Sequence, residues 1–300
     1  MTSSAARVVL YSTCYRDIEQ YIAQWSASVA AQTDREFAIY VGLDDIPPEE
    51  ALALIGPDLK PRFYAAPAGA SPAEIRNGAF AAICREFDAV IMTDMDDVML
   101  PTRVERAKAS LADADLACCA MLLADSECRP TGAWFDPGDE VDRLLSRNVF
   151  GLSNTAYRTD LLSRCLPIPA ECVLVDWLVA TRAWTLGANI SFDHTPGMLY
   201  RQYDHNIARV VPPFSWENVR RAANLILGHY RILAGEAARR YPHLAGDIQS
   251  RMALIIGFMN VLEADPTVRR HYVEELNQLP QTHVWWEFVA HPRLENVWKH

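Results

Sequence analysis

Hydrophobic residues in the first hundred positions alternate between two kinds of pattern. Short apolar runs of strand length occupy Val8–Tyr11, Phe37–Leu43 and Arg62–Ala65, whereas Asp17–Gln32 carries apolar residues at helical spacing. The segment Ser71–Glu74 combines a serine cap, a first-turn proline and a glutamate, which is typical of a helix start. Strands that alternate with helices of this length predict βαβ units and a mostly parallel sheet.

The same patterns continue beyond these first elements, and they change character near Pro212-Pro213. From about Ser215 onward, long helical patterns interrupted by prolines dominate, so we expect one domain over residues 1–212 and a helical region over 213–300. The further expected helices are Glu49–Ile55, Ser71–Glu86, Arg103–Leu111 and Asp176–Leu186; the expected strands are Asp115–Leu123, Phe150–Arg158, Asn189–Phe192 and Gly197–Arg201; and Ser126–Asn148 is expected to be rich in loops.

The most informative apolar run, Val90–Met92, stops at a cluster of acids formed by Asp94, Asp96 and Asp97. Such a run predicts a buried strand that emerges at the edge of a sheet, and α/β proteins bind ligands at the carboxyl ends of their strands. Three acids without an adjacent Lys or Arg repel one another unless a cation lies among them. We therefore predict a divalent-metal site, with a solvated acidic turn as the alternative.

Composition narrows the class of protein. Half of the 300 residues are hydrophobic, which suffices for a sizeable core, and the net charge of -10 argues against general nucleic-acid binding. The sequence has neither a secretory signal nor an apolar run long enough to span a membrane. The seven cysteines show no metal-ligand spacing and are expected to be buried thiols, so we expect a cytoplasmic protein. Peripheral membrane contact and the oligomeric state stay open.

Four further polar features follow the chain in a definite order. They are Asp44-Asp45 at the end of the second strand, Arg76-Asn77-Gly78 in the helix before the acidic strand, Asp176-Trp177 at a helix start, and Tyr200-Arg201 followed by His205-Asn206. Parallel strands bring their carboxyl ends to one edge, so Asp44-Asp45 should lie near the acids.

With Gln32-Thr33 and the Leu100-Pro101 that follows the acids, this ordered set resembles the family 2 glycosyltransferases over about residues 7–207. The departures are a first loop without asparagine, Ile-Pro-Pro after Asp45, and Val175 in place of an acid before Asp176. The QxxRW signature of processive synthases is absent, which argues against that subclass.

The resemblance implies an α/β fold of the GT-A type, with a Rossmann-like, mostly parallel central sheet flanked by helices and a C-terminal helical extension. It implies a nucleotide-sugar-binding half over about residues 1–100 and an acceptor half over about 101–212. The implied activity is a metal-dependent, inverting transfer of one sugar from a nucleotide-sugar, by default a UDP-sugar. The acceptor would be a saccharide, a lipid-linked molecule or another small molecule, and the cofactor Mn²⁺ or Mg²⁺.

The resemblance also suggests roles for individual residues. Asp96 is expected to bind the metal directly, Asp94 to bind metal or ribose, and His205 to bind metal or the departing diphosphate. Asp176 is expected to act as the general base for the acceptor hydroxyl, whereas a helix N-cap is its structural alternative. The residues expected to contact the nucleotide-sugar are Thr13, Tyr15, Asp45, Arg76, Asp94, Met95 and Arg201.

Three alternative functions stay open at this point. In a phosphatase of the haloacid-dehalogenase type, Asp94 would be phosphorylated and Asp96 would act as acid and base. Such an enzyme needs a downstream lysine, and only Lys108 and Lys299 follow the acids. A sugar nucleotidyltransferase would need an N-terminal glycine-rich loop, which Arg7–Arg16 lacks. The third alternative is a degenerate glycosyltransferase-like binding protein.

Overall fold

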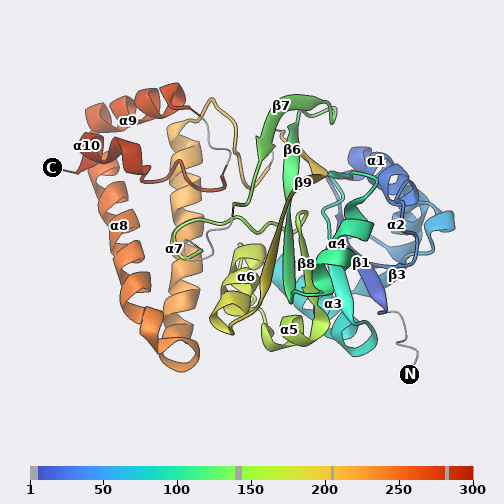
Figure 1. Ribbon diagram of the computed structural model, residues 1–300. Helices are drawn as coiled ribbons and strands as arrows, with labels where there is room; N and C mark the ends of the chain where they lie inside the picture. The colour runs from blue at the N-terminus through green and yellow to red at the C-terminus, as the bar shows by residue number, and fades with distance from the viewer. Residues whose placement is uncertain (1–5, 139–143, 204–205, 281–283, 300) are drawn as a thin grey trace. The chain divides into compact units, whose positions relative to one another are not determined.

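The computed structural model describes residues 6–138, 144–203, 206–280 and 284–299, and the chain divides into two compact units (Figure 1). The first unit comprises Met1–Asp139, Phe150–Glu171 and Val175–Arg201, and the second comprises Glu140–Val149, Cys172–Leu174 and Gln202–His300. The first unit contains the acid cluster of Asp94, Asp96 and Asp97, together with Arg76, Asp176 and Arg201. The boundary that we expect near residue 212 remains a proposal.

The N-terminal half of the first unit is built from parallel strands joined by helices. β1 (Val8–Tyr15) pairs in parallel with β2 (Ala38–Asp44) and with β4 (Ala89–Met92), and β2 pairs in parallel with β3 (Arg62–Ala65). The connecting helices are α1 (Glu19–Ala30), α2 (Pro48–Ile55) with the short η1 (Pro57–Leu59), and α3 (Pro72–Glu86). α3 begins with the expected capping box, in which Ser71 and Glu74 bond each other's backbone.

The second half of the sheet is mixed. The strands β5 (Val98–Met99), β6 (Leu116–Ala124), β7 (Pro130–Phe135), β8 (Thr155–Arg158) and β9 (Ile190–Arg201) complete the order β3-β2-β1-β4-β8-β6-β9-β5, with β7 paired to β6. β6 and β9 are parallel, whereas β8 runs antiparallel to β4 and β6. The helices here are α4 (Arg103–Leu111), α5 (Thr159–Arg164) and α6 (Val175–Thr185). The expected α/β fold with flanking helices is confirmed.

Several local predictions were wrong. The segments Asn189–Phe192 and Gly197–Arg201 belong to one strand, β9, because register shifts opposite Cys119–Met121 let it pass its polar middle without ending. The loop-rich middle contains β7, and the short β5 and α5 were not expected.

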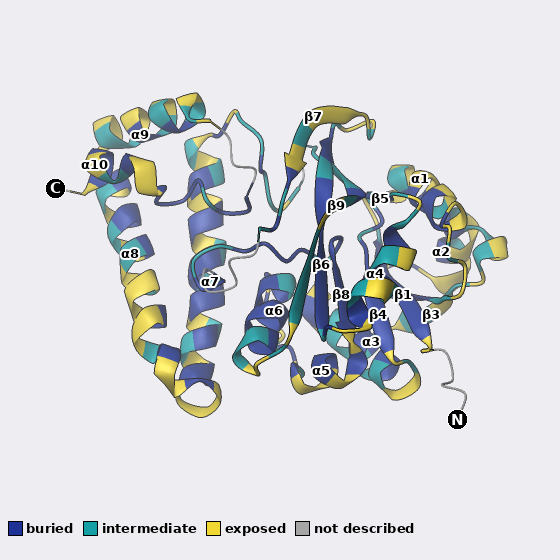
Figure 2. Ribbon diagram, viewed as in Figure 1, coloured by how far each residue is buried: buried dark blue, intermediate teal, exposed yellow. Residues whose placement is uncertain are grey.

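Burial follows the sheet, and the strands at its centre are the most buried (Figure 2). All four residues of β4 are buried, and β1 is buried from Val8 to Cys14. β4 lies in the middle of the strand order and β5 at its end. The acidic segment therefore connects two strands that are not neighbours in the strand order, and β5 pairs with β9 instead.

The second unit is helical, as expected for the C-terminal region. It contains α7 (Trp216–Arg240), α8 (Ala245–Ala264), α9 (Pro266–Gln278) and α10 (Glu295–Trp298), with the short turns η3 (Pro242–Leu244) and η4 (Pro292–Leu294). The aromatic tail helps to form its core, since the Trp298 ring meets the Phe258 ring edge-on and the Tyr272 hydroxyl donates to the Phe288 carbonyl. Within the described parts of the chain, no helix combines the length and apolar character needed to cross a membrane.

Candidate active site

The acid cluster lies on the loop that connects β4 to β5. Asp94, Asp96 and Asp97 each offer one carboxylate oxygen, and these three oxygens all lie within 4.8 Å of one another. A backbone hydrogen bond from the Asp97 amide to the Asp94 carbonyl (3.2 Å) tightens the loop into a turn. Carboxylate oxygens at this spacing are the ligands that Mg²⁺ and Mn²⁺ prefer, so the residues present fit such an ion.

A serine that the sequence patterns did not single out organises this cluster. The Ser153 hydroxyl donates to a carboxylate oxygen of Asp97, lies 3.4 Å from Asp94 Oδ2, and accepts the Asp94 backbone N–H at 3.0 Å. Ser153 is buried just before β8, and β8 pairs with β4, so the sheet itself brings the serine to the acids. The only sequence signal for Ser153 is that it begins a short polar run, Ser153-Asn154-Thr155, within an otherwise apolar stretch.

The electrostatics of the cluster favour a cation. Burial, followed by the neighbouring charge of Asp96, raises the pKa of Asp94 to about 7. Burial and the charges of Asp96 and Asp94 also raise the pKa of Asp97 well above its usual value. The carboxylates are therefore crowded and poorly hydrated, and a divalent ion would relieve the repulsion that they exert on one another.

Arg76 lies among the ends of three strands. Its positive charge lowers the pKa values of Tyr11 in β1, Asp44 in β2 and Asp94 after β4, although burial raises all three overall. The Arg76 Nε is buried and has no hydrogen-bond partner among the residues that the structure describes. A buried donor without a partner is costly, so this guanidinium is suited to meet an anionic or polar ligand.

The neighbours of Arg76 explain the Arg-Asn-Gly motif. The Asn77 side chain accepts the backbone N–H of Ile168 at 2.9 Å, which ties α3 to the segment that precedes α6. A Cβ at Gly78 would lie 1.9 Å from the Tyr64 hydroxyl, so any larger residue there would force the Tyr64 side chain to move. The helix turn that carries Arg76 is therefore held by Ile168 and packs closely against Tyr64.

The residues predicted to hold the nucleobase lie at the ends of β1 and β2. Thr13 is buried and shares a hydrogen bond of 3.1 Å with the Tyr11 hydroxyl, and Tyr15 is opposite Asp44 in the strand register. Asp45 follows β2 with a positive φ of 56°, a conformation that Asp tolerates better than most residues. Met95 is buried within the acidic loop.

Asp176 lies in the first turn of α6, and its charge raises the pKa of Asp94. The predicted base and the predicted metal site are therefore close enough to interact electrostatically. Arg182, one and a half turns later, is buried and donates to the backbone carbonyls of Cys165 (2.5 Å) and Pro167 (2.7 Å). It fixes the segment that leads toward the start of α6.

Of the two remaining predicted site residues, Arg201 and His205, the structure describes only Arg201. Arg201 ends β9, is buried, and directs its guanidinium at protein oxygens. His205 lies outside the described residues.

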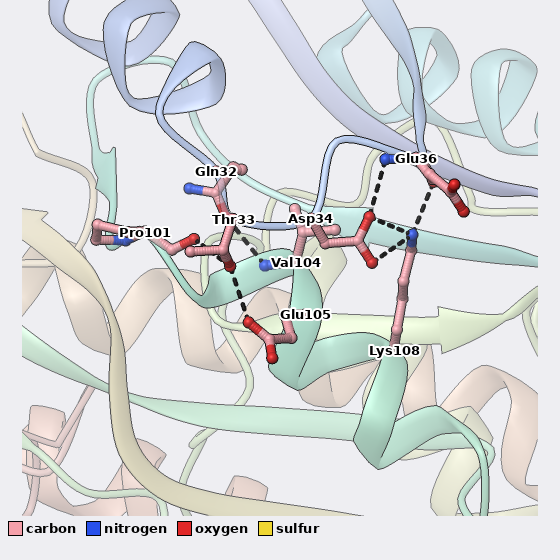
Figure 3. A network of polar contacts seen from close by, with 8 residues as sticks. All are labelled: Gln32, Thr33, Asp34, Glu36, Pro101, Val104, Glu105 and Lys108. Carbon is pink, nitrogen blue, oxygen red and sulfur yellow. Dashed lines mark hydrogen bonds and ion pairs between the residues drawn. The ribbon is translucent and has the colours of Figure 1, made fainter.

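A polar network clamps the segment that follows the acids (Figure 3). Gln32 donates to the Leu100 carbonyl (3.0 Å) and accepts the Val104 N–H (3.0 Å), and the Thr33 N–H donates to the Pro101 carbonyl (2.9 Å). The Gln-Thr pair and the Leu-Pro that follows the acids, which are distant in sequence, are therefore hydrogen-bonded partners. The start of α4 is fixed by this network.

Comparison with known proteins supports the fold. No protein-family model matches the chain, and no curated protein matches its sequence significantly. Among solved structures, TarS 1–349 from S. aureus superposes with a TM-score of 0.59 at 16% identity, over 83% of this chain and 71% of that one. The same protein in complex with UDP-GlcNAc gives 0.56 at 17% identity, over 84% and 72%.

A mannosyltransferase, PcManGT from Pyrobaculum calidifontis in complex with GDP-Man and Mn²⁺, gives a TM-score of 0.58 at 15% identity, over 99% of this chain and 89% of that one. Over the longer TarS structure, the chain spans 50% of that protein. At these identities the likeness establishes a shared fold, and a structure with this fold has been solved with a nucleotide-sugar and a divalent metal.

Proposed function

We propose that this protein is a metal-dependent glycosyltransferase of the family 2 type, which moves one sugar from a nucleotide-sugar donor to an acceptor hydroxyl. The observation that carries the proposal is the cluster of Asp94, Asp96 and Asp97 at the carboxyl end of a central strand, in a fold shared with a GDP-Man- and Mn²⁺-bound mannosyltransferase. Fold likeness alone does not determine activity, so the chemistry must come from the side chains at this edge.

The donor would be held by residues from the ends of three parallel strands. Asp96 and Asp94 would bind Mn²⁺ or Mg²⁺, whose charge stabilises a departing nucleoside diphosphate. Thr13, Tyr15 and Asp45 would face the nucleoside, with Met95 beside the acids. Arg76 would supply its buried, unpartnered Nε to the base or to a phosphate. UDP-sugars and GDP-sugars are the donors to test first, since the two similar proteins were solved with UDP-GlcNAc and GDP-Man.

Asp176 would act as the general base. Its carboxylate would take the proton of the acceptor hydroxyl as that oxygen bonds to the anomeric carbon and the bond to the diphosphate breaks. Such a displacement inverts the configuration at the anomeric carbon. The position of Asp176 near the acids supports this role, because its charge is felt at Asp94.

The acceptor is proposed to be a saccharide, a lipid-linked molecule or another small molecule, met by the segments Ser126–Asn148 and Phe150–Cys172. The acidic composition gives no basis for a nucleic-acid partner. A cytoplasmic location is proposed because none of the seven cysteines, all of which lie in the described residues, forms a disulfide, and five of them are buried.

The phosphatase alternative finds less support in the geometry. It needs a lysine near Asp94, but Lys108 is ion-paired to Asp34 at 2.7 Å and also donates to the Glu36 carbonyl. A degenerate binding protein would share the donor site and differ only in turnover, so activity must decide between the two.

The proposal is tested by measuring nucleoside diphosphate release from UDP- and GDP-sugars, with and without Mn²⁺. We expect Mn²⁺-dependent release with inversion of configuration, and a loss of about 100-fold or more in kcat for Asp176→Asn with little change in donor affinity. Full turnover by a folded Asp176→Asn variant would place the base elsewhere. Donor binding without any release would favour the degenerate protein, and phosphate release that depends on Asp94 would favour the phosphatase.

A further inference from the structure

Polar side chains in α1 and just after it hold the chain that follows the acidic loop. Gln24 and Ser28 in α1 and Gln32 just after it are four residues apart, the spacing of one helix face. The Ser28 hydroxyl accepts the Met99 N–H at 3.2 Å, and Gln32 bonds the Leu100 carbonyl and the Val104 N–H. These bonds fix the chain after the acids to α1.

Arg201 extends this support to the acids themselves. Its Nε donates to the Asp96 carbonyl, its Nη1 to the Ser126 carbonyl and its Nη2 to Gln24 Oε1, each at 2.6 Å. Its backbone N–H donates to Asp97 Oδ1 at 2.8 Å. The guanidinium carbon lies 4.2 Å from the centre of the Tyr21 ring in α1, within the range of a cation–π contact.

We propose that Arg201 is a positioning residue that fixes Asp96 and Asp97 for the cation and does not contact the nucleotide-sugar. One residue holds the Asp96 main chain and the Asp97 carboxylate, and Gln24 and Tyr21 hold that residue in turn. Partners of this kind orient metal ligands without touching the ion. The role toward a cation rests on the proposed function, whereas the support of the loop does not.

The two arginines of the site contrast in what their donors can do. Arg201 is only 1% exposed, and three of its N–H groups already meet protein oxygens. Arg76 is partly exposed and has a buried Nε without a partner among the described residues. A diphosphate needs donors that protein oxygens do not already take up, so Arg76 is suited to the ligand and Arg201 to the loop.

The decisive experiment measures hydrogen exchange of the amides in residues 94–99, on metal-free protein in EDTA. Arg201→Lys keeps the charge but loses the planar fork that reaches three acceptors. We expect these amides to exchange about 10-fold faster in Arg201→Lys, and several-fold faster in Gln24→Ala, than in the wild type. Arg158→Ala is the matched control, because Arg158 is an exposed arginine of the same unit that pairs with Asp160 at 3.4 Å.

Binding measurements then separate positioning from contact. We expect Arg201→Lys to weaken Mn²⁺ binding in the presence of UDP or GDP by about 10-fold or more, with metal-free affinity for the same nucleotide unchanged. Unchanged exchange in both Arg201→Lys and Gln24→Ala overturns the inference, as does a loss of metal-free nucleotide affinity. If Arg201→Lys does not fold, exchange in Gln24→Ala alone decides. Failure of the wild type to bind Mn²⁺ and nucleotide would refute the proposed function, and the exchange result would still judge the support of the loop.

Discussion

The raised pKa of Asp94 makes the stability of the protein depend on pH. A carboxyl group whose pKa is raised on folding favours the protonated form in the native state. Its contribution to stability is therefore present at low pH and is lost as the pH rises from the unfolded value of 3.8 toward about 7. Above about pH 7 the native state must keep a half-buried carboxylate that is crowded by other acids.

We predict that Asp94→Asn stabilises the metal-free protein at about pH 8 by about 1 kcal/mol, because the amide removes a half-buried charge beside Asp96. The gain should shrink toward zero as the pH falls to about 4. Urea unfolding in EDTA over this range measures the effect, with Asp58→Asn, at an exposed position, as the control. Equal effects of both substitutions on the free energy of unfolding at every pH would show that folding does not raise the pKa of Asp94.

Individual site residues could be predicted only where a pattern marks them. The acids were evident because an apolar run ends at them, and the Arg-Asn-Gly motif was evident because it follows the helix-start signal at Ser71–Glu74. Ser153 and Gln24 could not be found this way. Their importance arises from hydrogen bonds to Asp97 and to Arg201, which are 56 and 177 positions away along the chain.

At the scale of elements, α1 and α4 are joined by two kinds of contact that differ in strength. Gln32 is 3% exposed and bonds two backbone groups of the segment around the start of α4. The ion pair between Lys108 and Asp34 is partly exposed, with side chains 22% and 27% accessible. Buried backbone groups that lose a partner are costly, whereas partly exposed ion pairs contribute little.

We predict that Gln32→Ala lowers the free energy of unfolding by about 1–3 kcal/mol, because it leaves the Val104 N–H and the Leu100 carbonyl without this partner. Lys108→Ala should lower it by about 1 kcal/mol or less. Chemical denaturation of both variants at the same ionic strength makes the comparison. A larger loss for Lys108→Ala would contradict the ranking and would mean that the surface ion pair dominates this contact.

Most elements of the parallel half could be predicted because local signals agreed with the final structure. β3 has the predicted bounds, and α3 begins at its predicted cap. The mixed half was harder. A short strand such as β5 is defined by its pairing with β9. β9 stays continuous because its extra residues bulge out opposite Cys119–Met121 while its pairing with β6 resumes beyond them. Such long-range pairing leaves little trace in local periodicity.

At the scale of the whole molecule, the sheet order gives the site its chemistry. Three parallel strands bring Thr13, Asp44-Asp45 and the acids to one edge of the sheet. Ser153, just before β8, and Arg201, at the end of β9, then hydrogen-bond the Asp97 carboxylate in the acidic loop. The second unit forms its own helical core, which includes the aromatic tail. The central claim is that this edge binds a nucleotide through a metal held by the acids.

That claim is tested most directly by thermal unfolding of wild type, Asp96→Ala and the exposed control Asp58→Ala, with nucleoside diphosphates and nucleotide-sugars, with and without Mn²⁺. At about 100 times its dissociation constant a ligand should add about 2.7 kcal/mol to stability. We predict that one nucleotide stabilises wild type and Asp58→Ala far more with Mn²⁺ than without it, and that Asp96→Ala loses this Mn²⁺-dependent gain. An equal Mn²⁺-dependent shift in Asp96→Ala, or no response of the wild type to any nucleotide, would contradict the account.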